Sequence, residues 1–318
     1  MRLLKLATIA VAAIAALASP TQAADKPASV RVTYVASPFN VPSIVMRKKG
    51  YLEEAFGALG VRIESPEITS GAAQIQALAA GAVDIASVLG GTSAILGRAN
   101  GIDLKVIAAY SRSPKAFAVM TAAGGPTSIK EMKGKRVAGP KGTTLNQLLA
   151  AALAAEGMKL TDVEYLNMDI PAARAALLSG KVDAATLAGA NGLQVEAAGG
   201  RILASGDGLI APTSVIAVRT AFLRDHPELV GAYLAAHRKA LAFLRDSPEE
   251  ALKIAADDQK ISIDDARKQM PWYDFTLAMT DGDVRNLEAD QTFMVEAGML
   301  QKTIDIRAQL IDPLAFKP

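Results

Sequence analysis

The sequence contains no cysteine, and this absence removes several kinds of site at once. Without thiols the chain can form no disulfide, no cysteine nucleophile and no cysteine-ligated metal site, and it has no cysteine for a lipid anchor. Histidine occurs only twice, and we expect His226 and His237 at surface or helix-capping positions because both lie in the helical C-terminal part. The scarcity of these residue types leaves few means of catalysis or metal binding.

Aromatic residues make up only 5% of the chain, and charge is nearly balanced, with 34 basic and 32 acidic residues. No basic stripe is present, so nucleic acid is not expected as a partner. The chain lacks a nucleophile elbow, a metal-spaced His/Glu pair and a dinucleotide glycine fingerprint, and the turn at Lys141 lacks the ending of a P-loop. The sequence therefore predicts no catalytic residue, no metal site and no cofactor.

Long apolar runs are absent after the first segment of the chain. Arg2 and Lys5 precede the apolar run 6–18, and small residues follow it, which is the pattern of a secretory signal peptide. We expect cleavage near Ala23 or Ala24, so that residues 1–23 are a leader. No later stretch approaches the roughly 20 apolar residues of a spanning helix, and a soluble mature chain is expected. Loss of the two leader cations leaves 32 basic and 32 acidic residues.

Short β-type runs alternate with helical runs from Val30 to Arg219, and this alternation predicts α/β lobes with mostly parallel sheets. We expect strands at 30–36, 61–66, 84–88, 104–110, 116–121, 136–138, 163–167, 184–187, 202–205 and 214–219. Helices are expected between many of them, at 72–80, 92–100, 144–156 and 171–179. After Arg219 the pattern becomes helical, at 227–244, 248–257, 262–269 and 283–297.

An internal repeat predicts that the two lobes are similar. The segment 77–84 (ALAAGAVD) recurs at 176–183 (ALLSGKVD), 99 residues later, and Gly90 corresponds to Gly189 at the same offset. Each copy has the pattern of a helix, a glycine stop and a buried strand. We expect Asp84 and Asp183 to organise these turns, because each follows the glycine at the start of a strand.

The candidate site lies in the loops that follow the strands, because ligands of open α/β sheets bind outside the carboxyl ends of the strands. Several of these loops carry hydroxyl and glycine residues at helix starts, where free N–H groups favour an anion. The same residue types also serve as ordinary N-caps, so each loop taken alone admits a purely structural reading. The predicted contact set is Phe39, Asn40, Ser70, Gly71, Gln74, Gly91, Thr92, Thr143, Thr144 and Asn146, with Tyr110 as a weaker member.

The densest aromatic cluster follows Pro271, at Trp272, Tyr273 and Phe275. This cluster could close over the cleft or pack against the first lobe. Packing is favoured, because aromatic side chains belong to cores more often than to sites.

Four segments together resemble the periplasmic solute-binding proteins of the aliphatic sulfonate, taurine and nitrate importers, a family that includes pyrimidine-precursor binders. They are 81–86 (GAVDIA), 101–108 (GIDLKVIA), 133–138 (KGKRVA) followed by 141–143 (KGT), and 180–184 (GKVDA). The resemblance implies a two-lobed type II periplasmic binding protein fold, a Venus flytrap whose C-terminal helices return to lobe 1. Lobe 1 is then expected at 24–112 and 212–318, and lobe 2 at 113–211.

The resemblance also implies a function and partners. It implies the substrate-binding component of an ABC importer: a periplasmic monomer that binds a small solute, with an organic anion such as a sulfonate as one candidate, and that docks on a membrane permease. The segment 188–191 (AGAN) departs from the larger residues of sulfonate-type members, which leaves room for a bulkier or flatter solute. Two alternatives stay open: a receptor that serves a sensor, and an enzyme resembling a pyrimidine-precursor synthase on the same fold.

Overall fold

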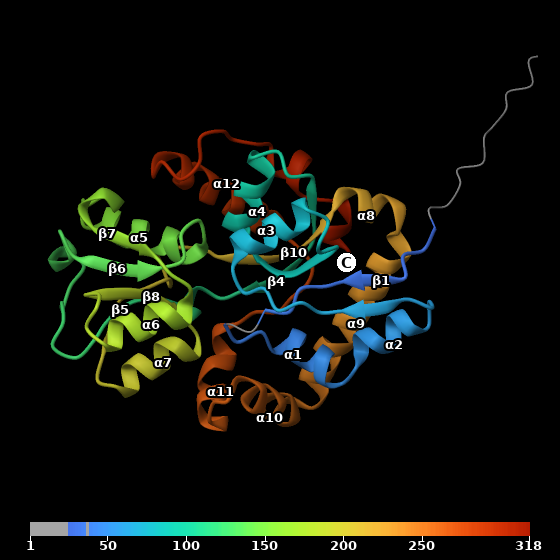
Figure 1. The fold of residues 1–318 in the computed structure, drawn as a ribbon, viewed down its shortest axis with the longest axis horizontal. Helices are drawn as coiled ribbons and strands as arrows, with labels where there is room; N and C mark the ends of the chain where they lie inside the picture. Colours follow the sequence, from blue (N-terminus) through green and yellow to red (C-terminus); the bar gives the residue numbers. More distant parts are fainter. Residues whose placement is uncertain (1–24, 36–37) are drawn as a thin grey trace, which may run out of the picture.

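The computed structural model describes residues 25–35 and 38–318, which form two α/β lobes (Figure 1). The predicted leader, 1–23, lies outside the described residues. The first lobe is defined here by strands β1–β4 and β10 with the helices around them, and the second lobe by the elements from β5 to β9. The predicted α/β class and two-lobed architecture are confirmed.

The sheet of the first lobe has the order β3-β10-β4, and β10 runs antiparallel to both neighbours. The parallel pair β1–β2 extends this sheet through the bridge between Val32 and Ile85. The strands are β1 (Ser29–Arg31), β2 (Arg62–Glu64), β3 (Ile85–Gly90), β4 (Leu104–Arg112) and β10 (Thr213–Arg219).

The sheet of the second lobe has the order β7-β6-β8-β5-β9. Its strands are β5 (Phe117–Thr121), β6 (Arg136–Gly139), β7 (Glu164–Asn167), β8 (Ala184–Ala188) and β9 (Arg201–Ser205). Strand β6 is parallel to β7 and β8, whereas β5 is antiparallel to β8 and β9. In each sheet four of the five strands run in the same direction, so the expected mostly parallel sheets are confirmed. The exceptions are β5 and β10, the first strands after the crossings between the lobes, which run antiparallel to their neighbours.

Helices cover the faces of both sheets (Figure 1). The first-lobe helices are α1 (Val41–Lys48), α2 (Tyr51–Gly57), α3 (Gly71–Ala79) and α4 (Gly91–Ala99), and the second-lobe helices are α5 (Thr144–Ala155), α6 (Ile170–Leu178) and α7 (Ala190–Ala197). The later helices are α8 (Thr220–Asp225), α9 (Pro227–Asp246), α10 (Pro248–Gln259), α11 (Ile263–Gln269) and α12 (Asp281–Glu296), followed by the π-helix η5 (Ile306–Leu310). Helix α9 packs on α1 and α2, and α12 packs on α4, so the C-terminal helices return to the first lobe.

Single-turn 3-10 helices join several of these elements. They are η1 (Pro114–Ala116), η2 (Lys130–Met132), η3 (Leu160–Asp162), η4 (Met270–Trp272) and η6 (Pro313–Phe316). Among the described residues, no helix combines the length and the apolar character that crossing a membrane requires.

The internal repeat has the same geometry in both lobes. Gly81 and Gly180 end α3 and α6 with φ of 66° and 70°, a left-handed conformation that favours glycine. The carboxylate of Asp84 accepts the backbone N–H of Arg31 at 2.9 Å, and that of Asp183 accepts the N–H of Arg136 at 2.8 Å. Each aspartate thus ties the turn before its own strand to a neighbouring strand, at the last residue of β1 for Asp84 and at the first residue of β6 for Asp183.

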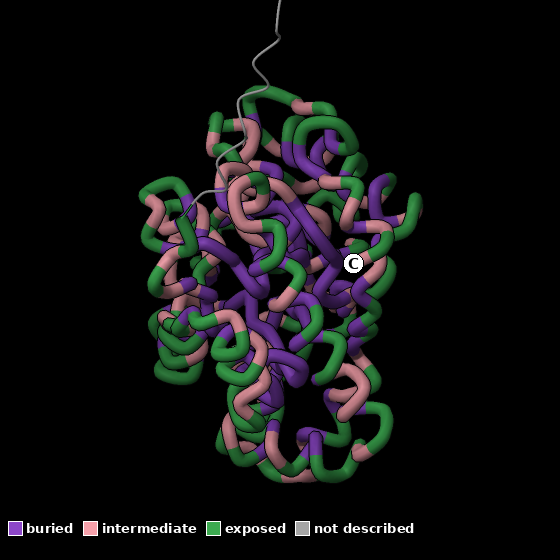
Figure 2. The backbone as a smooth tube through the Cα atoms, turned by 90° about the vertical axis from the view of Figure 1, so that its right-hand side faces the viewer, coloured by how far each residue is buried: buried purple, intermediate pink, exposed green. Residues whose placement is uncertain are grey.

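The core runs through the strands of both lobes, where buried backbone lies inside an exposed surface (Figure 2). His237 belongs to this core, which corrects its predicted surface position: it is fully buried on α9. Its ring meets those of Tyr110 and Tyr233 at centroid distances of 5.4 and 6.1 Å. Neither ring nitrogen has a hydrogen-bond partner among the described residues. Burial lowers the pKa of His237 to about 3, and the charge of Arg238 acts in the same direction.

This buried imidazole predicts a loss of stability in acid. A histidine has a pKa of about 6.5 in an unfolded chain, so between pH 6.5 and 3 the unfolded state binds more protons than the folded one. Folding stability therefore falls by about 1.4 kcal/mol per pH unit as the pH drops through this window. We compare the free energy of unfolding of His237→Leu with that of the native chain, measured by urea unfolding at pH 7 and at pH 4.5. The difference should shift by about 3 kcal/mol in favour of the variant at the lower pH.

Tyr233→Phe is the matched control, because it removes a neighbouring hydroxyl that has no partner among the described residues and keeps the imidazole. It should retain the acid dependence of the native chain. An equal stability difference between His237→Leu and the native chain at both pH values would show that His237 does not titrate in this way.

Candidate binding cleft between the lobes

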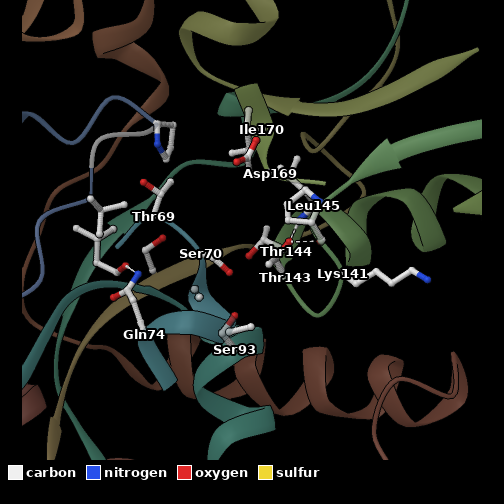
Figure 3. A pocket seen from close by; sticks show the side chains of 18 of the residues that line it. Thr69, Ser70, Gln74, Ser93, Lys141, Thr143, Thr144, Leu145, Asp169 and Ile170 are labelled. Carbon is white, nitrogen blue, oxygen red and sulfur yellow. Dashed lines mark hydrogen bonds between the residues drawn. The ribbon is translucent and has the colours of Figure 1, made fainter. Parts of the chain in front are cut away.

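A pocket of about 290 Å³ lies between the two lobes, at the carboxyl ends of strands from both sheets (Figure 3). Four helices begin at it: α3 and α4 of the first lobe and α5 and α6 of the second. The first lobe lines it with Val35, Pro38, Thr69, Ser70, Gly71, Ala72, Gln74, Val88, Gly90, Ser93 and Ser214. The second lobe lines it with Phe117, Pro140, Lys141, Thr143, Thr144, Leu145, Asn167, Met168, Asp169 and Ile170.

The first-lobe wall is formed by the starts of α3 and α4. Ser70 is the N-cap of α3, and its side chain accepts no hydrogen bond from the first turn, so the N–H groups of that turn are not capped by it. At Gly71 an added Cβ would lie 2.4 Å from the hydroxyl oxygen of Ser93. Glycine is therefore required where the two helix starts approach each other. The sequence predicted Ser70 and Gly71 as contacts, and both line the pocket.

The second-lobe wall is the start of α5. The hydroxyl of Thr143 donates to the carbonyl of Pro140 at 2.8 Å and accepts from the N–H of Leu145 at 3.3 Å, so it holds the loop and caps the helix. The hydroxyl of Thr144 has no partner among the described residues and faces Ser70 across the pocket (Figure 3). Of the two predicted threonines, Thr144 is the one with a hydroxyl free for a ligand.

Gln74 also lines the pocket, but its amide is already engaged. Its oxygen accepts from the hydroxyl of Thr33 at 3.2 Å, and its nitrogen donates to the carbonyl of Val88 at 2.9 Å. Because the side chain is buried and makes two hydrogen bonds within the protein, Gln74 supports the floor of the pocket and presents little polar surface to a ligand.

The start of α6 completes the pocket and was not included in the predicted contact set. Asp169 caps this helix by accepting from the N–H of Ala172 at 2.8 Å, and Asn167 accepts the N–H of Lys141 at 3.0 Å. A signal was available, because residues 169–171 place an aspartate and a proline directly after the strand predicted at 163–167. The same strand-end rule that selected Thr143 would have selected Asp169.

The pocket has few charged side chains among the residues that line it. Only Lys141 and Asp169 are ionisable, and the lysine side chain extends away from the pocket, with its nitrogen 6.0 Å from the ring centroid of Tyr165 (Figure 3). Positive potential comes instead from the starts of α3, α4 and α5, which carry a partial positive charge, whereas the carboxylate of Asp169 offsets that of α6. The arrangement suits a small anion with an apolar remainder, since Val35, Phe117 and Ile170 supply apolar surface.

Six predicted contact residues lie outside the lining of this pocket, and five of them pack or hydrogen-bond elsewhere in the protein. The ring of Phe39 packs on that of Tyr273, with the ring centroids 6.2 Å apart, and the amide nitrogen of Asn40 donates to the carbonyl of Val35. The hydroxyl of Tyr110 is buried against Ser43 at 3.1 Å. Gly91 packs on Leu287 and Thr213, and the side-chain oxygen of Asn146 accepts a hydrogen bond from the N–H of Gly142. Thr92 is buried on α4, and its hydroxyl has no partner among the described residues.

The aromatic cluster packs in the first lobe, as favoured above. Tyr273 is buried and stacks on Phe275 with ring centroids 5.4 Å apart, and burial raises the pKa of its hydroxyl. Neither Trp272 nor Tyr273 lines the pocket.

The fold and the interlobe pocket define a protein of the two-lobed periplasmic binding protein class, and solved structures with this fold cover most of the chain. The periplasmic aliphatic sulphonate binding protein SsuA of Escherichia coli matches with a TM-score of 0.75 at 22% identity, over 91% of this chain and 93% of that one. The alkanesulfonate-binding protein SsuA of Xanthomonas axonopodis pv. citri, bound to MOPS, matches with a TM-score of 0.81 at 20% identity, over 91% and 100%.

The chain belongs to the NMT1/THI5 like family, whose model matches residues 38–251. A putative aliphatic sulfonates-binding protein of Bacillus subtilis is 28% identical over 274 residues, which are 84% of this chain and 81% of that protein. The taurine-binding periplasmic protein of Escherichia coli is 30% identical over 182 residues, 55% of each chain. The predicted resemblance to the periplasmic binding proteins for aliphatic sulfonates and taurine is thereby confirmed.

Proposed function

We propose that the chain is the substrate-binding component of an ABC importer and binds a small organic anion, such as a sulfonate, in the pocket between its lobes. Relatives named for binding aliphatic sulfonates and taurine support this proposal. The observation that carries it is the meeting of four helix starts at one pocket that also offers apolar surface. Helix N-termini bind anionic oxygens through backbone N–H groups without a basic side chain.

In this proposal Ser70, Gly71 and Thr144 contact the anionic group from opposite lobes. Phe117 and Ile170 contact the apolar part of the solute, and Gln74 and Thr143 hold the walls in place. The protein binds its solute without converting it, acts as a periplasmic monomer after loss of residues 1–23, and meets the membrane permease.

We further propose that residues 24–112 with 212–318 and residues 113–211 are the two bodies that move when the cleft opens. The pairing of Arg112 at the end of β4 with Thr213 at the start of β10 supports this division, because the two crossings then lie side by side. A hinge at this point would let solute binding shift the population toward the closed arrangement.

A thermal-shift panel tests the proposed function. The mature protein is screened against alkyl and aryl sulfonates, carboxylates, nitrate and pyrimidines, and a solute at 100 times its dissociation constant should stabilise the native state by about 2.7 kcal/mol. For the best solute, Thr143→Ala with Thr144→Ala should weaken binding about tenfold to a hundredfold, because a hydrogen bond to a charged group contributes about 1.5–3 kcal/mol. Unchanged affinity in this variant, or sustained turnover of a bound solute, would contradict the proposal.

A further inference from the structure

The two lobes contact each other through a pair of buried polar side chains, Gln147 and Asp290, which lie outside the lining of the pocket. Gln147 lies on α5 of the second lobe, and its amide nitrogen donates to a carboxylate oxygen of Asp290 on α12 of the first lobe at 2.5 Å. Both side chains are buried, with 3% and 6% of their surface exposed. A carboxyl group is costly to bury, so its position at the boundary between the two lobes calls for an explanation.

The pair is connected directly to the wall of the pocket. Gln147 lies one helical turn after Thr144, so movement of Gln147 moves the start of α5. A second hydrogen bond crosses between the lobes nearby, from the hydroxyl of Ser93 to the carbonyl of Gly142 at 3.2 Å. The Gln147–Asp290 contact is therefore one of two hydrogen bonds that join α5 and the loop before it to helices of the first lobe.

The hydrogen bonding of the pair is incomplete when Asp290 is ionised. The amide oxygen of Gln147 is buried and has no partner among the described residues. A carboxylate only accepts hydrogen bonds, so ionised Asp290 can satisfy the amide nitrogen and leaves the amide oxygen unpaired. A protonated carboxyl group can also donate, and it would form two reciprocal hydrogen bonds with the amide.

The charged groups on the elements around Asp290 have partners elsewhere or lie at the surface. Helix α5 carries no charged residue, α4 carries only Arg98, β10 only Arg219 and η5 only Arg307. These three arginines pair with Asp103, Asp84 and Asp281, respectively. The remaining charged residues of α12 and of the loop after it are Asp283, paired with Arg112, and the exposed Arg285, Glu288, Glu296, Lys302 and Asp305.

Burial is the main influence on the protonation of Asp290. It raises the pKa of Asp290 to about 6, although the hydrogen bond from Gln147 acts to lower it. Separation of the lobes would return the carboxyl group to water, where the pKa of an aspartate is about 3.9.

We propose that Gln147 and Asp290 form an interlobe clasp, which holds the lobes together more strongly when Asp290 is protonated. Weak acid then favours the closed cleft and, if the proposed function is right, raises the affinity for solute. The shift between pH 7.5 and pH 5 should change the ratio of closed to open protein by about tenfold, given a pKa of about 6 in the closed state and 3.9 in the open one.

The test measures the distance between the lobes without any solute. Spin labels are attached at Ala155→Cys on α5 and Glu296→Cys on α12, two exposed positions in a chain without native cysteine. We expect the ratio of the short-distance to the long-distance population to rise about tenfold from pH 7.5 to pH 5. A ratio that does not change with pH in the native side-chain background would overturn the proposal.

Asp290→Asn is the decisive variant, because its amide is neutral at both pH values and can form both hydrogen bonds with Gln147. It should keep the short distance at pH 7.5 as well as at pH 5. Gln147→Leu removes the partner from the other lobe and should reduce the short-distance population at both values. A pH response that persists in Asp290→Asn, or short distances unchanged in Gln147→Leu, would show that the clasp does not hold the lobes.

The experiment separates the clasp from the proposed function. A pH-dependent distance with no solute found in the binding panel would support the clasp and count against the transport proposal. Solute binding combined with distances that do not change with pH would support the transport proposal and contradict the clasp.

Discussion

Replacing Arg112 with methionine is expected to cost about 3–5 kcal/mol of folding stability, because it leaves a buried carboxylate without its cation. The guanidinium holds both oxygens of Asp283 at 2.6 and 2.7 Å and donates to the carbonyls of Thr276 and Ala278 at 2.9 and 3.0 Å. Asp283 is 2% exposed and lies in the first turn of α12, where it completes a capping box with Thr280. The change should appear as a lower midpoint in urea unfolding.

The matched control combines Arg112→Met with Asp283→Asn. It removes the buried charge together with its partner, so it should recover part of the lost stability. Burial acts to raise the pKa of Asp283, but the hydrogen bonds from Arg112 and Thr280 and the charge of Arg112 hold it below the usual value. The stability that Asp283 contributes is therefore present above about pH 3.9 and is lost as the pH falls through the folded pKa. Equal stabilities of the single and double variants would contradict the ion-pair account.

Ser70→Asp is expected to reduce the affinity for an organic anion by about a hundredfold or more. Aspartate is as good an N-cap as serine, so α3 should keep its stability. Its carboxylate would occupy the free N–H groups at the helix start, where the solute is proposed to bind, and like charges in contact cost several kcal/mol. Calorimetric titration with the best sulfonate or carboxylate of the panel measures the loss.

Ser70→Asn is the control for this change, because it has nearly the same size and capping ability without the charge. It should lose much less affinity than Ser70→Asp. If both variants bind the anion equally well, the start of α3 does not hold the anionic group. A melting temperature close to that of the native chain should accompany both variants, which separates an effect on binding from an effect on folding.

The parts of the fold that follow periodic rules could be predicted from the sequence. Strands such as 104–110 and helices such as 144–156 carry clear patterns, and the repeated glycine and aspartate at Gly81 and Asp84 mark equivalent turns. The antiparallel direction of β5 and β10 could not be predicted, because strand direction depends on the path of the crossings and leaves no periodic signal in a short apolar run.

The candidate site was predictable at helix starts and less so elsewhere. Ser70, Gly71 and Thr144 were found because a strand end followed by a cap is a local pattern. Tyr110 and Asn40 follow similar patterns, but their side chains point into the core, and this orientation is set by packing between distant segments. His237 was misplaced although a signal existed, since it continues the buried stripe of Val230, Tyr233 and Leu234 at helical spacing.

A crystal structure of the mature protein with the best solute of the panel tests the central claim most directly. The account predicts the solute between the lobes, with its anionic group at hydrogen-bonding distance from the first-turn N–H groups of α3 and from the hydroxyl of Thr144. Its apolar part should contact Phe117 or Ile170. A solute bound at any other place on the protein, or an anionic group held away from the helix starts, would contradict the account.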